Sequence, residues 1–322
     1  MNALLKIEGL KTHFFTSAGV VKAVDGVSLE VPEGGTLGIV GESGSGKSVT
    51  AMSVLRLVSE PGRIVGGKVL LRQKGEAADL LSLPVENLRD VRGGVIAMIF
   101  QEPMTSLNPV FTIGDQIEEA VALHQKGLSK AERRDKVFES LSLVRVPDPE
   151  RAARAYPHEL SGGMRQRAMI AMALSCRPAL LIADEPTTAL DVTIQAQVLD
   201  LLRELRERLG MAVILITHDL GIIAETVDRV AVMYAGRVVE EGATADLFAK
   251  PRHPYTRALL HALPTLETKG RLQTIPGSVP DLSRLPRGCA YQDRCERVQA
   301  RCRSEEPPLE NGARCFYPYG GS

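Results

Sequence analysis

The sequence has no excess of charge of either sign, because 39 lysines and arginines balance 39 aspartates and glutamates. Proteins that grip nucleic acid through its phosphates usually carry a basic surplus, so this balance argues against such a partner. The sequence also has no run of about 18 or more apolar residues, so the chain does not itself span a membrane, although a membrane partner stays open. Residues Met1–Glu8 lack the basic stretch and apolar core of a secretory signal, and we expect a cytosolic protein.

Internal repeats and low-complexity tracts are absent too, and 322 residues are enough for two domains with buried cores. Predicted strands and helices alternate from residue 179 onward: Ala179–Ala183 and Met211–Thr217 are strand-like, and Val192–Leu209 and Leu220–Thr226 are helix-like. This alternation predicts an α/β fold with a parallel sheet that is covered on both faces. Prolines become frequent after about residue 250, which indicates a separate, loop-rich C-terminal module.

The segment Gly41–Ser48 matches the phosphate-binding pattern G-x-x-x-x-G-K-[ST] at every position. It follows the apolar stretch Thr36–Val40, a predicted strand, and precedes the helix-compatible run Val49–Val58. Glycines let the backbone turn tightly and point its N–H groups at phosphate oxygens. Lys47 adds a positive charge for the terminal phosphates, and Ser48 offers a hydroxyl to Mg²⁺. A glycine-rich turn that carries a lysine by chance is the alternative, and the strand–loop–helix context argues against it.

Two acids, Asp184 and Glu185, stand at the end of the apolar strand Leu180–Asp184. Ligands of a parallel sheet bind beyond the carboxyl ends of its strands, and carboxylates there need a cation to meet or a water to orient. Asp184 is therefore expected to share Mg²⁺ with Ser48, and Glu185 to activate the attacking water. A solvated strand end is the alternative when the acids are considered without the phosphate-binding segment.

The segment Leu160–Gln166 reads LSGGMRQ, and its serine, Ser161, stands where the N-cap of the helical run Met164–Cys176 belongs. Glycine costs about 1 kcal/mol against alanine in a helix interior, a cost that a structure tolerates where another group must approach the backbone closely. A helix N-terminus with a serine hydroxyl is an anion site. The chain therefore has a second phosphate-binding device, which we expect to serve a nucleotide on another molecule. A capped helix with a glycine-rich entry is the alternative.

These segments together resemble the ATP-binding subunits of ABC transporters and, within that group, the ATPases of bacterial oligopeptide and dipeptide importers. The likeness extends over nearly the whole chain. It includes a Q-loop glutamine at Gln101, a D-loop at Ala189–Asp191 and a switch histidine at His218. The resemblance implies an α/β fold of the ABC type, in which a P-loop nucleotide-binding domain has a mixed sheet core and a helical subdomain.

The same resemblance sets the expected domain limits. Residues 1–250 would form the nucleotide-binding domain, with its helical subdomain at about 110–176. Residues 251–322 would form a small, loop-rich C-terminal extension that contains cysteines.

The resemblance also assigns roles to residues in a pair of subunits that hold two ATP molecules between them. Hydrolysis would depend on Glu185, His218, Gln101 and Lys47. The ATP-binding residues would be Phe14 (stacked on adenine, with Phe15 as the neighbouring alternative), Gly41, Ser43, Gly44, Ser45, Gly46, Lys47, Ser48 and Val49. Mg²⁺ would be held by Ser48, Gln101 and Asp184. The ATP of the partner subunit would meet Ser161, Gly162, Gly163, Gln166 and Asp191.

The C-terminal extension carries the segment His253–Thr256, which resembles a marker of peptide-importer ATPases and predicts a proline-started helix. Beyond it, four cysteines have the spacing C-x5-C-x6-C-x12-C: Cys289, Cys295, Cys302 and Cys315. Clustered cysteines in a reducing cytosol favour a metal over disulfides, and four thiolates suit zinc or an iron–sulfur cluster. The resemblance favours a [4Fe–4S] cluster with a structural or sensing role, while zinc, free thiols and disulfides stay open as alternatives.

The expected function is that of a transport ATPase, a hydrolase that drives peptide uptake. It would lie peripherally on the cytoplasmic face of the bacterial inner membrane, with two membrane permease subunits and a second ATPase subunit, more often a paralogue than a copy. An extracytoplasmic peptide-binding protein would be an indirect partner, and nucleic acid would not be one. The alternative is a soluble ABC-type ATPase that acts on nucleic acid or ribosomes. The sequence leaves open which peptide or other cargo is carried, whether the ATPase pair is homo- or heterodimeric, and what the C-terminal module regulates.

Overall fold

The computed structural model describes residues 3–73, 75–101, 106–188, 190–263 and 274–320. The chain divides into two compact units. The first unit is built from Met1–Pro32, Thr36–Ser82 and Leu215–Ser322, and the second from Glu33–Gly35 and Leu83–Ile214. The predicted limit near residue 250 lies inside the first unit and stays a prediction.

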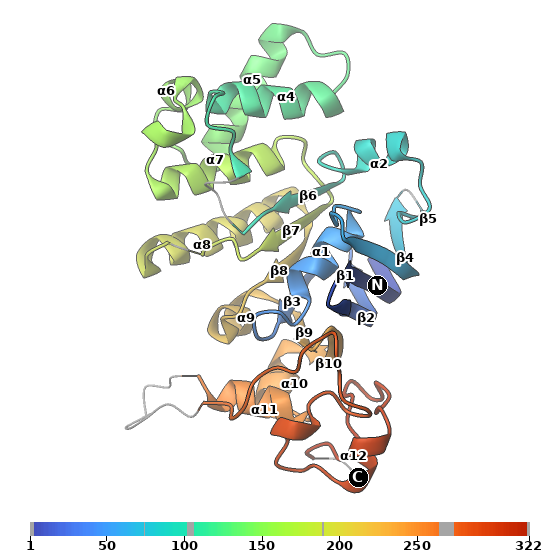
Figure 1. Ribbon diagram of the computed structural model, residues 1–322. Helices are drawn as coiled ribbons and strands as arrows, with labels where there is room; N and C mark the ends of the chain where they lie inside the picture. Colours follow the sequence, from blue (N-terminus) through green and yellow to red (C-terminus); the bar gives the residue numbers. More distant parts are fainter. Residues whose placement is uncertain (1–2, 74, 102–105, 189, 264–273, 321–322) are drawn as a thin grey trace. The chain divides into compact units, whose positions relative to one another are not determined.

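The first unit contains a four-stranded antiparallel sheet with the order β2-β1-β4-β5 (Figure 1). Its strands are β1 (Ala3–Thr16), β2 (Gly19–Pro32), β4 (Gly62–Gln73) and β5 (Glu76–Asp79). Apolar side chains such as Leu5, Leu10 and Val27 are fully buried in it. A buried hydrogen bond of 2.8 Å between the hydroxyls of Thr12 and Ser53 joins β1 to the helix that follows the phosphate-binding segment.

A six-stranded mixed sheet has the order β10-β9-β3-β8-β7-β6. Its strands are β3 (Thr36–Val40), β6 (Ile96–Ile99), β7 (Leu180–Asp184), β8 (Ala212–Ile216), β9 (Arg229–Tyr234) and β10 (Arg237–Ala243). The pairs β3–β9 and β6–β7 are parallel, whereas β9 and β10 form an antiparallel hairpin. Every residue of β3, β7 and β8 is buried, as the continuous apolar runs of these strands require in a sheet covered on both faces. The predicted α/β fold with a mixed sheet core is confirmed.

The helices of the two units are as follows. The first unit has α1 (Lys47–Val54), α9 (Leu220–Thr226), α10 (Thr244–Ala249), α11 (Pro254–His261), the 3-10 helix η2 (Gln292–Arg294) and α12 (Ala300–Ser304). The second unit has α2 (Val85–Val91), α4 (Ile113–His124), α5 (Lys130–Leu143), α6 (Pro149–Arg154), the 3-10 helix η1 (Pro157–Glu159), α7 (Gly162–Leu174) and α8 (Val192–Leu209).

Helices α4, α5, α6 and α7 of the second unit pack on one another (Figure 1). Capping boxes begin two of them: the hydroxyl of Thr112 accepts the Asp115 N–H, and that of Ser129 accepts the Glu132 N–H. These four helices fall within the stretch predicted as a helical subdomain. In the described part of the chain, no helix combines the length and apolar character needed to cross a membrane.

The C-terminal part of the first unit is anchored to β10 through Glu240. This carboxylate is buried and accepts the N–H groups of Arg252 and His253, at 2.7 and 2.8 Å. His253 in turn caps α11, because its Nδ1 accepts the N–H of Tyr255 at 3.0 Å, and Pro254 is the first residue of this helix. The predicted proline-started helix is therefore present.

Residues 312–314 pair with β10, the strand at one end of the six-stranded sheet. The Arg314 N–H donates to the Val239 carbonyl at 2.7 Å, and the Glu241 N–H donates to the Gly312 carbonyl at 2.8 Å. The final strand of the sheet is thus covered by the chain's own C-terminal segment.

His253 makes the stability of this region depend on pH. Its imidazole is buried, and burial lowers its pKa to about 3 from the ordinary value of 6.5, with the nearby Arg314 charge as a second cause. Between these two values the unfolded chain binds a proton that the folded chain does not. The contribution of His253 to the free energy of unfolding is therefore complete above pH 6.5. It is lost as the pH drops towards 3, by up to about 1.4 kcal/mol per pH unit.

We expect His253→Asn, whose side-chain oxygen can still cap α11, to reduce this dependence. The measurement is urea unfolding of the parent chain and the variant at several pH values between 7 and about 4.5. Parallel curves for the two proteins would show that His253 titrates alike in the folded and unfolded states.

Candidate functional site

The phosphate-binding segment Gly41–Ser48 connects β3 to α1, as the sequence predicts. Gly41, Gly44 and Gly46 have φ values of 151°, 76° and 100°, which favour glycine. A Cβ atom on Gly41 would lie 2.2 Å from the Met233 carbonyl oxygen, and one on Gly46 would lie 2.2 Å from that of Ala23. The backbone of the segment is therefore packed against β9 and β2 so closely that only glycine fits at these two positions.

Lys47 is almost buried and lies across the segment. Its Nζ donates to the carbonyl oxygens of Gly41 and Glu42, at 2.8 and 3.1 Å. The Ser45 N–H also donates to the Glu42 carbonyl, at 3.1 Å, while Ser43 and Gly44 are exposed at the tip. An ammonium group and an exposed glycine-rich turn at a helix N-terminus form a binding site for an anion.

Two more residues predicted for the site lie in the same unit. His218 is exposed and directly follows the buried residue Thr217, whose hydroxyl accepts the Asp219 N–H at 3.0 Å. Phe14 is partly buried against Gly62, where a Cβ would lie 2.7 Å from its ring, whereas 47% of Phe15 is exposed. The adenine-stacking role of Phe14 stays a prediction.

In the second unit, the acids at the end of β7 lie in different surroundings. Asp184 is buried, with 4% of its surface exposed. Glu185 has a φ of 46°, a left-handed conformation that costs a residue with a side chain about 1–2 kcal/mol. Its Oε2 accepts hydrogen bonds from Gln101 Nε2 at 3.1 Å and from Thr188 Oγ1 at 2.9 Å.

These contacts bring together Gln101 and Glu185, which the sequence assigned to the same reaction from positions 84 residues apart. Strain persists where the surrounding structure imposes it, and such residues gather at functional sites. The role of Thr188 was not predicted. The only available signal was a hydroxyl three residues after the acid, which alone is too common to be informative.

The segment around Ser161 has the predicted geometry. The Ser161 hydroxyl accepts the Met164 N–H at 3.3 Å, so this serine is the N-cap of α7, and both Ser161 and Gly162 are exposed. A Cβ on Gly163 would lie 3.2 Å from Ile194 of α8, the helix that Asp191 caps by accepting the Ile194 N–H at 2.9 Å.

Gln166 is buried, and its amide donates to the Pro186 carbonyl just after the β7 acids. The signature segment, the D-loop residue Asp191 and the loop after β7 thus form one packed cluster within the second unit. Of the predicted D-loop, Ala189 lies outside the described residues.

The four C-terminal cysteines do not form the predicted metal centre, and the expectation of a [4Fe–4S] cluster, or of zinc in its place, is wrong. Among the described residues, no three or more His, Cys, Asp or Glu side chains are grouped so that they could hold a metal ion. All five cysteines, Cys176 included, are free thiols. Burial raises the pKa of Cys289 to about 12 and also raises the pKa values of Cys295 and Cys315.

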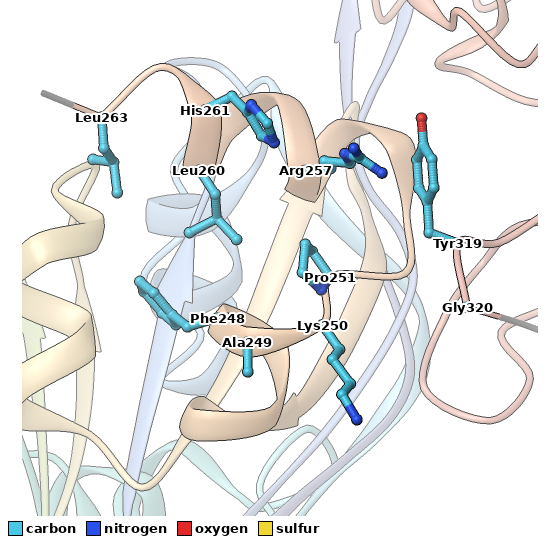
Figure 2. A pocket seen from close by; sticks show the side chains of 10 residues that line it. All are labelled: Phe248, Ala249, Lys250, Pro251, Arg257, Leu260, His261, Leu263, Tyr319 and Gly320. Atoms are coloured by element: carbon cyan, nitrogen blue, oxygen red, sulfur yellow. The ribbon is translucent and has the colours of Figure 1, made fainter. Parts of the chain in front are cut away.

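A cavity of about 730 Å³ opens beside α10 and α11 and the end of the chain (Figure 2). Its lining combines the apolar side chains of Phe248 and Leu260 with the basic side chain of Arg257, whose guanidinium lies 4.2 Å from the Tyr319 ring centre. None of the residues predicted to bind nucleotide lines this cavity, so it is not the predicted nucleotide site.

Comparison with known proteins supports the sequence motifs. A family described as "ABC transporter" matches residues 24–188, and one described as "Oligopeptide/dipeptide transporter, C-terminal region" matches residues 239–302. The chain is 54% identical to a probable peptide ABC transporter ATP-binding protein of Sinorhizobium fredii, over 95% of this chain and 91% of that one. It is 49% identical to the dipeptide transport ATP-binding protein of Escherichia coli, over 98% of this chain and 97% of that one.

Solved structures agree on the fold. A bacterial ABC transporter cassette with a dimeric structure superposes with a TM-score of 0.66 at 28% identity, covering 74% of this chain and 98% of the other. A second structure, an ATP-binding cassette dimer in a post-hydrolysis state bound to ADP and Pi, gives a TM-score of 0.65 at 28% identity, with the same coverage.

The packing of the phosphate-binding segment predicts unequal costs for two glycine substitutions. Gly44→Ala adds a Cβ that meets no atom within 4 Å, so only its positive φ is penalised, by about 1 kcal/mol. Gly46→Ala adds the same penalty and also forces the backbone away from Ala23, so it should lower the free energy of unfolding considerably more. Chemical denaturation of both variants and the parent chain measures the difference. Equal losses would mean that the contact with β2 is not a constraint.

Proposed function

The chain belongs to the ABC transporter family of ATP-binding subunits, and we propose that it is the ATP-hydrolysing motor of a bacterial importer of dipeptides or oligopeptides. The observation that carries the proposal is the presence of two regions in one chain. Residues 24–188 match the ABC transporter family, and residues 239–302 match the C-terminal region of oligopeptide and dipeptide transporters. The relatives named for peptide and dipeptide transport match over nearly the full length of the chain. The alternative of a soluble ATPase for nucleic acid or ribosomes has no comparable support.

We propose that the phosphates of ATP are held by the N–H groups of Gly41–Ser48 and by the Lys47 ammonium. The fit is supported by the close packing at Gly41 and Gly46, which holds the backbone of the segment in its turned shape. Val49 would line the same site, and the Phe14 ring would stack on adenine. Ser48, Gln101 and Asp184 offer the oxygen ligands that Mg²⁺ prefers, and the bound ion supplies charge neutralisation for the phosphates.

Glu185 is the proposed general base. Its carboxylate is fixed by two hydrogen bonds, from Gln101 and Thr188, so its orientation is set before a water arrives. A positioned base removes the proton of the attacking water as its oxygen bonds to the γ-phosphorus, while the bond from that phosphorus to the bridging oxygen breaks and ADP leaves with that oxygen. His218 would donate to the γ-phosphate and stabilise the charge that develops there.

The second phosphate-binding device would act on the ATP of a partner subunit through Ser161, Gly162, Gly163, Gln166 and Asp191. Exposure of Ser161 and Gly162 at the N-terminus of α7 supports this role, because a group on another molecule can reach them. The dimeric state of the related solved cassettes supports it too. We propose that the partner is a paralogue, so that the working pair is a heterodimer.

ATP-binding subunits of importers work with subunits that span the membrane, and we propose two permease subunits as the direct partners here. An external peptide-binding protein would deliver the cargo to them. This protein would then lie on the cytoplasmic face of the inner membrane, held peripherally by the permeases. The proposed domains are the nucleotide-binding domain 1–250, with its helical subdomain at about 110–176, and the extension 251–322.

The proposal is tested with the transporter purified from membranes together with its bound subunits and placed in vesicles. ATP should drive the uptake of labelled dipeptides or oligopeptides. Glu185→Gln should preserve ATP binding and slow ATP hydrolysis by about 100-fold or more, because the base is lost while the phosphate site is intact. Glu207→Gln, on the exposed face of α8, is the matched control and should leave the rate unchanged. Undiminished hydrolysis in Glu185→Gln would remove Glu185 from this role.

Lys47→Ala should act on an earlier step than Glu185→Gln. Removing a charge-assisted hydrogen bond to phosphate should weaken ATP binding by about tenfold or more. Fluorescent ATP titration measures this, with Lys68→Ala on the exposed part of β4 as the control. ATP affinity equal to that of the parent chain would show that Lys47 does not contact the phosphates.

A further inference from the structure

Glu42, the second residue of the phosphate-binding segment, is held by an arginine that lies 252 positions later in the chain. Arg294 Nη1 donates to Glu42 Oε2 at 2.6 Å, and Nη2 donates to Oε1 at 3.0 Å. This is a bidentate pair, in which the planar guanidinium matches both carboxylate oxygens at once. Arg294 ends η2 in the C-terminal part of the chain, so the pair ties that part to the phosphate-binding segment.

The Arg294 guanidinium is buried and makes several contacts in this arrangement. Its side chain is 4% exposed, against 30% for Glu42. Its Nε donates to the Pro276 carbonyl at 2.9 Å, and its central carbon lies 5.7 and 5.9 Å from the ring centres of Tyr234 and Tyr291. The hydrogen bond to Glu42 is the leading cause that raises the pKa of Arg294 above its ordinary value. Removing the partner of a buried charge strongly destabilises the folded state, so we expect Glu42 and Arg294 to keep their contact.

A second contact reaches the same residue from the same region. The Glu42 N–H donates to the Tyr255 hydroxyl at 2.9 Å, and Tyr255 is completely buried. The Tyr255 ring packs on Tyr234 and Tyr291, with ring centres 4.6 and 5.3 Å apart. Both the backbone and the side chain of Glu42 are thus held by Tyr255 and Arg294, which lie after β10 in the sequence.

Glu42 also contacts the lysine that is proposed to bind phosphate. Its carbonyl oxygen accepts from Lys47 Nζ at 3.1 Å and from the Ser45 N–H at 3.1 Å. The position of Glu42 therefore bears directly on where the Lys47 ammonium and the Ser45 amide lie.

The acid at this position requires an explanation, because the second position of the phosphate-binding pattern accepts any residue. A carboxylate beside a site for a triphosphate repels the ligand unless its charge is neutralised. The Arg294 guanidinium lies 2.6 Å from the Glu42 carboxylate and offsets its negative charge. An ion pair whose only purpose was stability would be a weak choice, since buried pairs seldom contribute more than apolar groups of the same size.

We propose that Arg294 is a positioning residue of the ATP site, through which the C-terminal part of the chain neutralises Glu42 and fixes the phosphate-binding segment. This inference rests on the proposed function, since it concerns how the same segment binds ATP. Nucleotide binding then depends on the C-terminal region of the chain. That region would contribute to ATP binding in addition to marking the chain as a peptide-importer subunit.

The test measures ATP affinity by titration in the purified chain, together with amide hydrogen exchange of residues 41–47. Arg294→Ala should weaken ATP binding by about tenfold at low salt and less at high salt, because an unpaired carboxylate repels phosphate and salt screens it. Exchange at the segment should become faster in this variant. Arg303→Ala, which removes a 59% exposed arginine from the same region, is the matched control and should change neither reading.

The double variant Glu42→Gln with Arg294→Gln removes both charges and should bind ATP within about threefold of the parent chain. A general folding defect caused by the loss of Arg294 would persist in the double variant. Restored ATP binding in the double variant would therefore show that the loss in Arg294→Ala comes from the unpaired charge of Glu42. The proposal is overturned if folded Arg294→Ala binds ATP as the parent does, or if the double variant binds as poorly as Arg294→Ala. Failure of the parent chain itself to bind ATP would instead reject the proposed function.

Discussion

The close approach of two backbone carbonyls to the phosphate-binding segment is the constraint on which the site depends. The carbonyls of Ala23 and Met233 lie where a Cβ on Gly46 or Gly41 would have to be. Because these carbonyls belong to β2 and β9, the shape of the segment is imposed by two strands from distant parts of the sequence. The amide groups of the segment are then held ready for an anion, and preorganised donors need no rearrangement when the charge arrives.

Local features of the fold could be predicted from the sequence because their signals are local. The structure has helices α8 and α9 at the predicted limits, Val192–Leu209 and Leu220–Thr226, since an aspartate caps each N-terminus. Helix α1 begins at Lys47 instead of Val49, because the phosphate-binding segment itself provides the first turn. Strand β9 was not predicted: a short apolar run has no period that distinguishes a strand from a buried helix.

Contacts between distant residues could not be predicted in the same way. Motifs indicated that Gln101 and Glu185 belong to one reaction, and the structure joins them by a hydrogen bond, but nothing pointed to Arg294 as the partner of Glu42. The cysteines show the opposite error. Four cysteines are the right residue type for a metal centre, yet their spacing does not say whether their sulfur atoms surround one point, and among the described residues no such group is found. A ligand set is a property of three-dimensional positions, which the sequence expresses only through the whole fold.

The pairing of the C-terminal segment with β10 has a consequence for the behaviour of the chain in solution. Gly312 and Arg314 occupy backbone groups of Glu241 and Val239 that would otherwise face outward along the last strand of the sheet. An uncovered strand edge is a template on which a strand of another molecule can add. The segment around Gly312 therefore protects this strand of the sheet from self-association, a task separate from nucleotide binding.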